Sequence, residues 1–161
     1  MIELSNKLAG LLNKHGLTIS TAESCTGGLV AKTITDISGV SSVYYGSVVS
    51  YDNSVKENVL GVKKETLDTV GAVSYDTACQ MALGVRRLMK TDIGISTTGI
   101  AGPGGGTPDK PVGTVYIAVA IGDSVEATLL DIDSTLSRDE IRHIATRLVL
   151  EDACKKILEK Y

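Results

Sequence analysis

Residues 17–34, LTISTAESCTGGLVAKTI, decide the fold class that we predict. Residues 17–21 alternate apolar and β-branched or small polar side chains, which predicts a short strand. The small residues from Ala22 to Gly28 predict a tight turn, and residues 29–34 continue as a helix that stops near Gly39. A strand that turns directly into a helix is typical of α/β proteins.

The flanking elements follow from the same signals. A helix is predicted at residues 2–15 and ends at Gly16. Residues 43–51 predict a strand, Asp52 or Asn53 is expected to cap a short helix, and another helix is expected after Lys63. A longer helix should begin after Ser74 and bury one stripe of side chains, formed by Ala78, Met81, Ala82, Val85 and Leu88. Three more strands are expected at residues 93–98, 115–121 and 125–132.

The last two strands should pair as a hairpin through Gly122-Asp123-Ser124, and the capping-box spacing of Ser137 and Glu140 predicts a final helix. Helices between early strands and a late antiparallel hairpin predict an α/β fold. We expect a three-layer α/β/α domain around a mixed sheet of about five strands. Because repeats and linkers are absent, residues 1–161 are expected to form one domain.

Composition excludes several classes of function. The net charge is −3, the basic residues are scattered, and the six Tyr are the only large aromatic residues, so we expect no nucleic-acid binding. No segment is apolar enough for a signal peptide or a membrane span, so we expect no membrane contact and a cytoplasmic location. Three widely spaced Cys and two distant His give no metal-ligand spacing, and we predict neither a metal site nor a cofactor.

Three segments that follow predicted strands are candidates for the functional site. The first is Thr21–Gly28, in which Ser24 is a candidate nucleophile and backbone N–H groups near Cys25, Thr26, Gly27 and Gly28 could bind a phosphate or an oxyanion. The alternative interpretation is that Ser24 or Thr26 only caps the helix. Cys25 is a competing candidate nucleophile, but small free cysteines are more often packing residues.

The second segment, Ser50–Lys56, brings Tyr51, Asn53 and Lys56 to the start of a short helix, where the helix dipole lowers a lysine pKa. A solvated lysine beside a capping residue is the alternative. The third segment, Thr98–Thr107, contains Gly99 and Gly102 and lets a substrate approach the backbone closely; the alternative is a mobile surface loop. Since His15 and His143 lie on predicted helices near the two ends of the chain, the base available to Ser24 is Lys56, directly or with Tyr51 as a relay.

Together these segments resemble the nicotinamide-nucleotide amidase family, also known as the C-terminal domain of the competence/damage-inducible protein CinA. The matching stretches lie in order along nearly the whole chain: Thr21–Gly28, Val48–Lys56, Gly71–Ser74, Gly99–Gly106 and Lys110–Val115. The resemblance implies deamidation of nicotinamide mononucleotide to nicotinic acid mononucleotide and ammonia, with a pyridine nucleotide as substrate and a homodimeric assembly. It places the family's serine, tyrosine and lysine on Ser24, Tyr51 and Lys56.

The family's third motif falls on Thr98, Gly99 and Gly102. Many relatives carry an additional N-terminal domain, and this chain is expected to be a free-standing form. One stretch departs from the family: Leu136-Ser137-Arg138 stands where relatives often have Gly-Asp-Arg. Arg138 and Arg142, one helical turn apart, are nevertheless expected to bind the substrate phosphate through charge-assisted hydrogen bonds.

Two other functions remain open at this stage. The chain could be a non-catalytic nucleotide-binding or regulatory module that keeps the pocket without turnover. It could also be a transferase that binds a phosphate at the same helix N-terminus, which would call for a second substrate or Mg²⁺. Asp131 and Asp133 alternate along a predicted strand and could share a face as metal ligands, but a simpler explanation is that they are solvated side chains at the edge of the sheet.

Overall fold

The computed structural model describes all residues from 1 to 161. Its elements are α1 (Ile2–His15), β1 (Ile19–Glu23), α2 (Leu29–Thr35), the 3₁₀ turn η1 (Val40–Ser42), β2 (Tyr44–Val49), α3 (Asn53–Asn58), α4 (Lys64–Thr69), α5 (Tyr75–Met89), β3 (Ile93–Gly99), β4 (Thr114–Ile121), β5 (Ser124–Asp131) and α6 (Arg138–Lys160). The prediction of an α/β domain with a five-stranded mixed sheet is confirmed.

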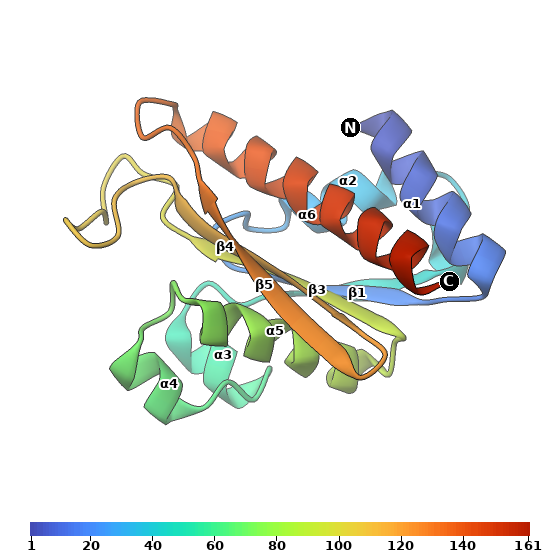
Figure 1. Cartoon of the computed structure of the whole chain (residues 1–161), viewed down its shortest axis with the longest axis horizontal. Coiled ribbons are helices and arrows are strands. Elements are labelled where there is room, and N and C mark those ends of the chain that lie inside the picture. Colours follow the sequence, from blue (N-terminus) through green and yellow to red (C-terminus); the bar gives the residue numbers. More distant parts are fainter.

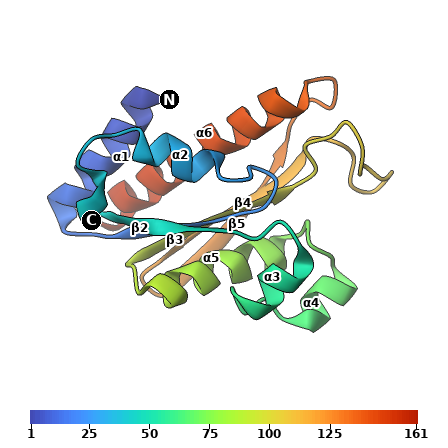
Figure 2. The same cartoon turned by 180° about the vertical axis from the view of Figure 1, so that it is seen from behind.

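The strand order is β2-β1-β3-β4-β5. β1 pairs in parallel with both β2 and β3, whereas β3–β4 and β4–β5 are antiparallel. Figure 1 shows α1, α2 and α6 on one face of the sheet and α3, α4 and α5 on the other. The reverse view in Figure 2 shows that α2 follows β1 on the first face, while α3 to α5 connect β2 to β3 across the second.

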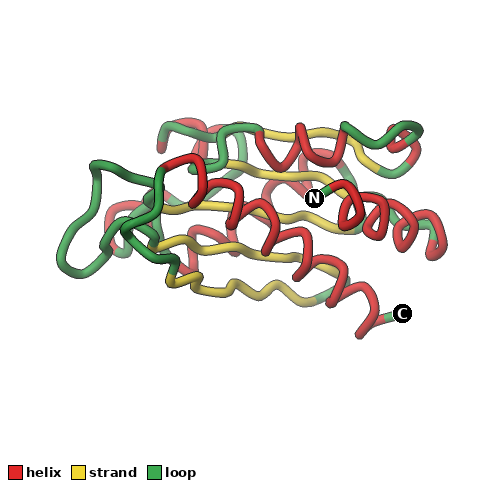
Figure 3. The backbone as a smooth tube through the Cα atoms, turned by 90° about the horizontal axis from the view of Figure 1, so that it is seen from above, coloured by secondary structure: helices red, strands yellow, loops and turns green.

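The main apolar core lies between the sheet and the layer of α1, α2 and α6. It contains Ile19 and Ile95 from central strands and Ile141 and Ile157 from α6. Seen from above, α6 runs obliquely along the sheet on the same side as α1 (Figure 3). On the opposite face α5 packs closely through small residues, because Ala78 and Ala82 meet alanines of β4. The fully buried strand β1 therefore lies between two apolar layers.

The predicted helix boundaries have local causes that the structure confirms. Gly16 ends α1 in the left-handed conformation, with φ 63°, and Ser74 caps α5 by accepting a bond from the Thr77 N–H. Ser137 and Glu140 form the expected capping box at α6. The expected hairpin turn joins β4 to β5.

Two details of the prediction are wrong. Leu88 is half exposed rather than buried, because Met89, four residues after Val85, continues the inward stripe of α5. β1 also runs through Glu23 instead of ending at Thr21, because residues 22 and 23 pair with both neighbouring strands. The turn that follows β1 is consequently shorter than predicted and begins at Ser24.

Candidate active site

The candidate site lies at the carboxyl ends of the three parallel strands. Ser24 follows β1, the segment that carries Tyr51 and Lys56 follows β2, and Thr98 and Gly99 end β3. The connections that follow β1 and β2 run over opposite faces of the sheet. A crevice lined by residues that follow or end all three parallel strands lies at this edge. Ligands of open α/β sheets bind at this kind of switch point.

Ser24 and Lys56 contact each other directly in this crevice. The Lys56 Nζ lies 3.0 Å from the Ser24 Oγ, although the two residues are 32 positions apart in sequence. Nζ also donates to the Ser50 carbonyl at 2.7 Å and lies 3.5 Å from the Tyr51 carbonyl. When a neutral amine directs its two N–H groups to these carbonyls, its lone pair faces the Ser24 hydroxyl.

Burial changes the acid–base properties of Lys56. The side chain is only 1% exposed and forms no salt bridge with a carboxylate. Desolvation lowers the pKa of Lys56 below its ordinary value of 10.5, and the nearby Cys25 and Asp52 oppose this shift only in part. A lysine with a lowered pKa can accept a proton from the serine that it contacts.

The turn after Ser24 is held by a carboxylate that the sequence interpretation overlooked. Glu23 is fully buried and accepts bonds from the N–H groups of Gly28, Val30 and Ala31, at 3.0, 3.0 and 2.7 Å. Glu23 therefore fills the N-terminus of α2. Of the N–H groups from Cys25 to Gly28 that were expected to bind a phosphate or an oxyanion, that of Gly28 is therefore not available, because it already has an intramolecular acceptor.

Two donors of the same turn remain free. The Ser24 N–H donates to the Thr97 carbonyl at 2.9 Å, and the Gly27 N–H donates to the Ser24 carbonyl at 3.1 Å. No oxygen atom of the protein accepts a hydrogen bond from the N–H groups of Cys25 and Thr26. Adjacent backbone N–H groups beside a nucleophile are the usual donors to a developing oxyanion.

The thiol of Cys25 is a poor alternative to the Ser24 hydroxyl. Cys25 is buried, and desolvation raises the pKa of its thiol to about 12. Nearly all of the side chain is then protonated at neutral pH, whereas the reactive form of cysteine is the thiolate. This position is therefore better explained by packing than by nucleophilic chemistry.

Tyr51 and Arg138 meet at the mouth of the crevice. The Arg138 Nη2 donates to the Tyr51 hydroxyl at 2.9 Å, and its Nη1 donates to the Gly102 carbonyl at 2.8 Å. The Tyr51 side chain is exposed, and its hydroxyl does not lie between Lys56 and Ser24. Arg142 instead donates to the Thr26 carbonyl at 2.7 Å and does not line the same cavity.

A cavity of about 180 Å³ joins these groups. Eight of the predicted site residues line it: Ser24, Cys25, Tyr51, Asn53, Lys56, Thr98, Gly99 and Arg138. The other five predicted residues, Thr26, Gly27, Gly28, Gly102 and Arg142, are not among its lining side chains. Ala72, Val73 and Ala101 complete the wall, and the Thr98 hydroxyl donates to the Ala72 carbonyl at 2.7 Å.

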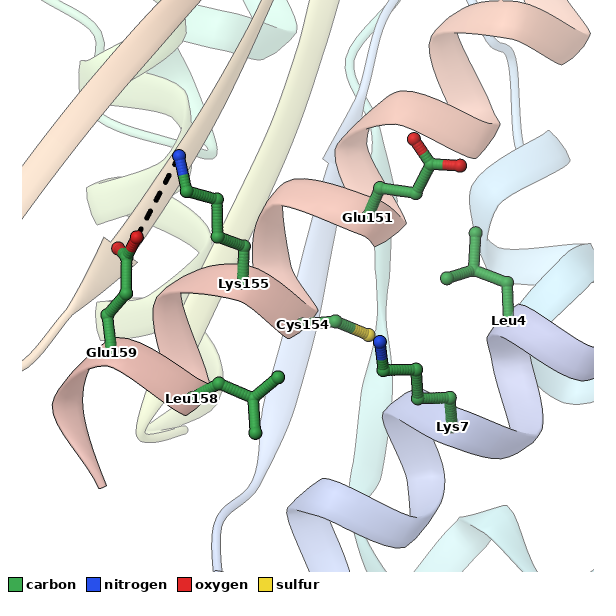
Figure 4. A pocket seen from close by; sticks show the side chains of 7 residues that line it. All are labelled: Leu4, Lys7, Glu151, Cys154, Lys155, Leu158 and Glu159. Atoms are coloured by element: carbon green, nitrogen blue, oxygen red, sulfur yellow. Dashed lines mark ion pairs between the residues drawn. The ribbon is translucent and has the colours of Figure 1, made fainter.

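A larger hollow, of about 380 Å³, lies elsewhere, between α1 and α6. Figure 4 shows its lining, in which Leu4 and Leu158 alternate with Lys7, Glu151 and other charged side chains. Its cysteine, Cys154, lies beside Lys7 in this view, but desolvation outweighs the effect of the lysine charge and raises the pKa of the thiol. Cavity size alone therefore does not identify the site.

No group of three or more His, Cys, Asp or Glu side chains is arranged to hold a metal ion. No helix combines the length and the apolar character needed to cross a membrane.

The fold and the site together define an α/β protein with a buried Ser–Lys pair at the carboxyl edge of a mixed sheet. The sequence model of the CinA C-terminal domain family matches residues 1–157, and the chain belongs to this family. A "putative competence-damage inducible protein" of Thermoanaerobacter sp. (strain X514) is 52% identical over 148 residues, which are 92% of this chain and 35% of that protein. The chain thus spans about a third of the length of the curated relatives that it matches.

Solved structures agree with the family assignment. The competence/damage inducible protein CihA from Agrobacterium tumefaciens is 42% identical, with a TM-score of 0.90 over 93% of this chain and 91% of that one. A CinA superfamily protein from Klebsiella pneumoniae is 32% identical, with a TM-score of 0.92 over 98% and 97% of the two chains.

Proposed function

We propose that this chain is a metal-independent amidohydrolase that converts nicotinamide mononucleotide to nicotinic acid mononucleotide and ammonia. The observation that carries the proposal is the 3.0 Å contact between the Lys56 Nζ and the Ser24 Oγ, inside a cavity and beside two free amides. The substrate itself comes from the resemblance to the nicotinamide-nucleotide amidase family.

The first half of the proposed reaction acylates Ser24. Neutral Lys56 takes the hydroxyl proton, and the Ser24 Oγ attacks the carboxamide carbon. The free N–H groups of Cys25 and Thr26 donate to the oxygen that becomes negative. The protonated Lys56 then returns a proton to the leaving nitrogen, so that ammonia departs and an acyl-enzyme remains.

In the second half Lys56 activates a water molecule, which attacks the acyl carbon and releases the acid. The hydrogen bonds of the Lys56 Nζ to two backbone carbonyls beside Ser24 support a role for Lys56 in both proton transfers. The contacts of Tyr51 with Arg138 support a role in positioning the substrate rather than in relaying the proton.

Arg138 is the better placed of the two arginines for the substrate phosphate. It lines the cavity, and neither of its contacts, the Gly102 carbonyl and the Tyr51 hydroxyl, is a carboxylate. A dianionic phosphate would gain charge-assisted bonds there. Arg142 supports the turn through Thr26. The homodimer that the family resemblance implies remains a prediction, which sedimentation equilibrium would check.

The direct test is to incubate the protein with nicotinamide mononucleotide in the presence of a chelator and to measure ammonia. We expect release by the unaltered chain and none above background by Ser24→Ala. Near-equal rates of the two proteins would exclude Ser24 as nucleophile. Ligand-induced thermal stabilisation without any product would instead support a nucleotide-binding regulatory module.

A further inference from the structure

Glu23 is, with Lys56, one of only two charged side chains that the fold buries. It has no basic partner. Its oxygens instead accept five hydrogen bonds: from the N–H groups of Gly28, Val30 and Ala31 and from the hydroxyls of Thr26 and Ser47. A buried charge without a counter-ion is costly unless several donors surround it, and here they do.

Four of these five donors belong to the segment directly after Ser24. The Thr26 hydroxyl lies 2.7 Å from Glu23 and equally close to the Thr97 hydroxyl of β3. Gly27 and Gly28 take left-handed conformations, with φ 58° and 100°, which let the chain fold back over the carboxylate. The turn is therefore fixed at Ser24 by β3 and at Gly28 by Glu23.

Between these two fixed points lie the only free donors of the turn, the N–H groups of Cys25 and Thr26. Their direction depends on the peptide planes of the turn, which the bonds to Glu23 hold.

We infer that Glu23 is a positioning residue that holds the free amides of Cys25 and Thr26 toward the reacting carbonyl. The inference rests on the proposed acyl chemistry at Ser24. It predicts that loss of the Glu23 charge destabilises the transition state much more than it lowers the affinity for the substrate.

The test compares Glu23→Gln with three other variants. Glu23→Asp keeps the charge but shortens its reach, and serves if the glutamine variant does not fold. Ser47→Ala removes only the weakest bond to the same carboxylate, at 3.4 Å. Ile157→Val weakens the core at the far end of α6 and controls for a simple loss of stability.

Steady-state ammonia release from nicotinamide mononucleotide is measured per folded molecule, well below each variant's melting temperature. We expect Glu23→Gln to lower kcat by roughly 10²-fold, the usual effect of a lost oxyanion donor, and to leave KM within about twofold. Glu23→Asp should also lose kcat, whereas both controls should keep it. An unchanged kcat in folded Glu23→Gln and Glu23→Asp would reduce Glu23 to a structural cap and overturn the inference.

A second readout separates this inference from the choice of substrate. A fluorophosphonate labels an activated serine when the Ser24 Oγ displaces fluoride from phosphorus, and the phosphoryl oxygen then takes the place of the oxyanion. The rate of labelling is followed by intact mass. If the unaltered chain releases no ammonia, the proposed substrate fails, yet slower labelling of Glu23→Gln still supports the role of Glu23. Equal labelling rates, or no labelling of the unaltered chain, would overturn it.

Discussion

The substitution Lys56→Met tests the proposed chemistry most directly, because methionine fills nearly the same space without an amine. The change removes the contact with the Ser24 Oγ and the bond to the Ser50 carbonyl. General base catalysis contributes about 10²- to 10⁴-fold, so kcat/KM should fall by at least that factor, or about 3–5 kcal/mol in activation free energy.

The expected effect on stability is much smaller. A buried Ser50 carbonyl without its donor costs about 1–3 kcal/mol, while the amine no longer has to be desolvated, which acts in the opposite direction. The free energy of unfolding should therefore change by less than about 3 kcal/mol, and the variant should fold. A large loss of activity in a folded protein is then a chemical effect.

The assay is ammonia release from nicotinamide mononucleotide by the unaltered chain, Lys56→Met, Ser24→Ala and the double variant. Because the two residues act as a unit, the double variant should be no slower than the slower single variant. Lys63→Met, an exposed lysine shortly after α3, is the matched control and should keep full activity. The reasoning is refuted if Lys56→Met retains more than about a tenth of kcat/KM or if the two losses multiply.

Four further predictions follow from the same structure. The kcat/KM of the unaltered chain should rise with pH through an ionisation with a pKa below 10.5, because neutral Lys56 is the active form. Between this lowered pKa and 10.5 the unfolded chain binds more protons than the folded chain. The free energy of unfolding, measured by denaturant titration, should therefore also rise with pH across this interval. Cys25→Ala should cost about 1 kcal/mol of stability in the same titration and keep turnover, since the thiol pKa of about 12 excludes a thiolate nucleophile; loss of all ammonia release would contradict this. Arg138→Ala should raise KM by roughly 10- to 100-fold with a smaller effect on kcat, as measured by steady-state kinetics, if its charge-assisted bonds hold the phosphate in the ground state and the transition state alike. Gly84→Ala places a Cβ 2.0 Å from a backbone oxygen of Leu60 and should lower stability by about 1–3 kcal/mol, whereas Gly10→Ala meets nothing within 4 Å in an exposed helix position and should raise the melting temperature.

Local sequence signals were enough to predict most of the fold. The glycine after α1, the cap at Ser74 and the capping box at Ser137 act over a few residues, so they can be identified without tertiary contacts. Leu88 shows where this reasoning fails. Either Leu88 or Met89 is compatible with the periodicity of the buried stripe of α5, and only tertiary packing selects Met89.

The sequence also identified the chemical groups of the candidate site, since Ser24, Tyr51, Lys56 and Thr98 each end a predicted strand or lie shortly after one. It could not show which of them touch. The direct contact between Lys56 and Ser24 depends on β1 and β2 lying side by side in parallel, and the contact between Arg138 and Tyr51 spans 87 positions.

Only the tertiary structure decided what the turn after β1 binds. From the sequence, its amides were equally suited to a phosphate or to an oxyanion. The fold buries Glu23 beneath the turn, where it accepts the N–H groups of α2 and leaves those of Cys25 and Thr26 free. Residue types and local periodicity determine which groups are present, but the order of the strands and the burial of one carboxylate determine which of these groups remain available to a substrate.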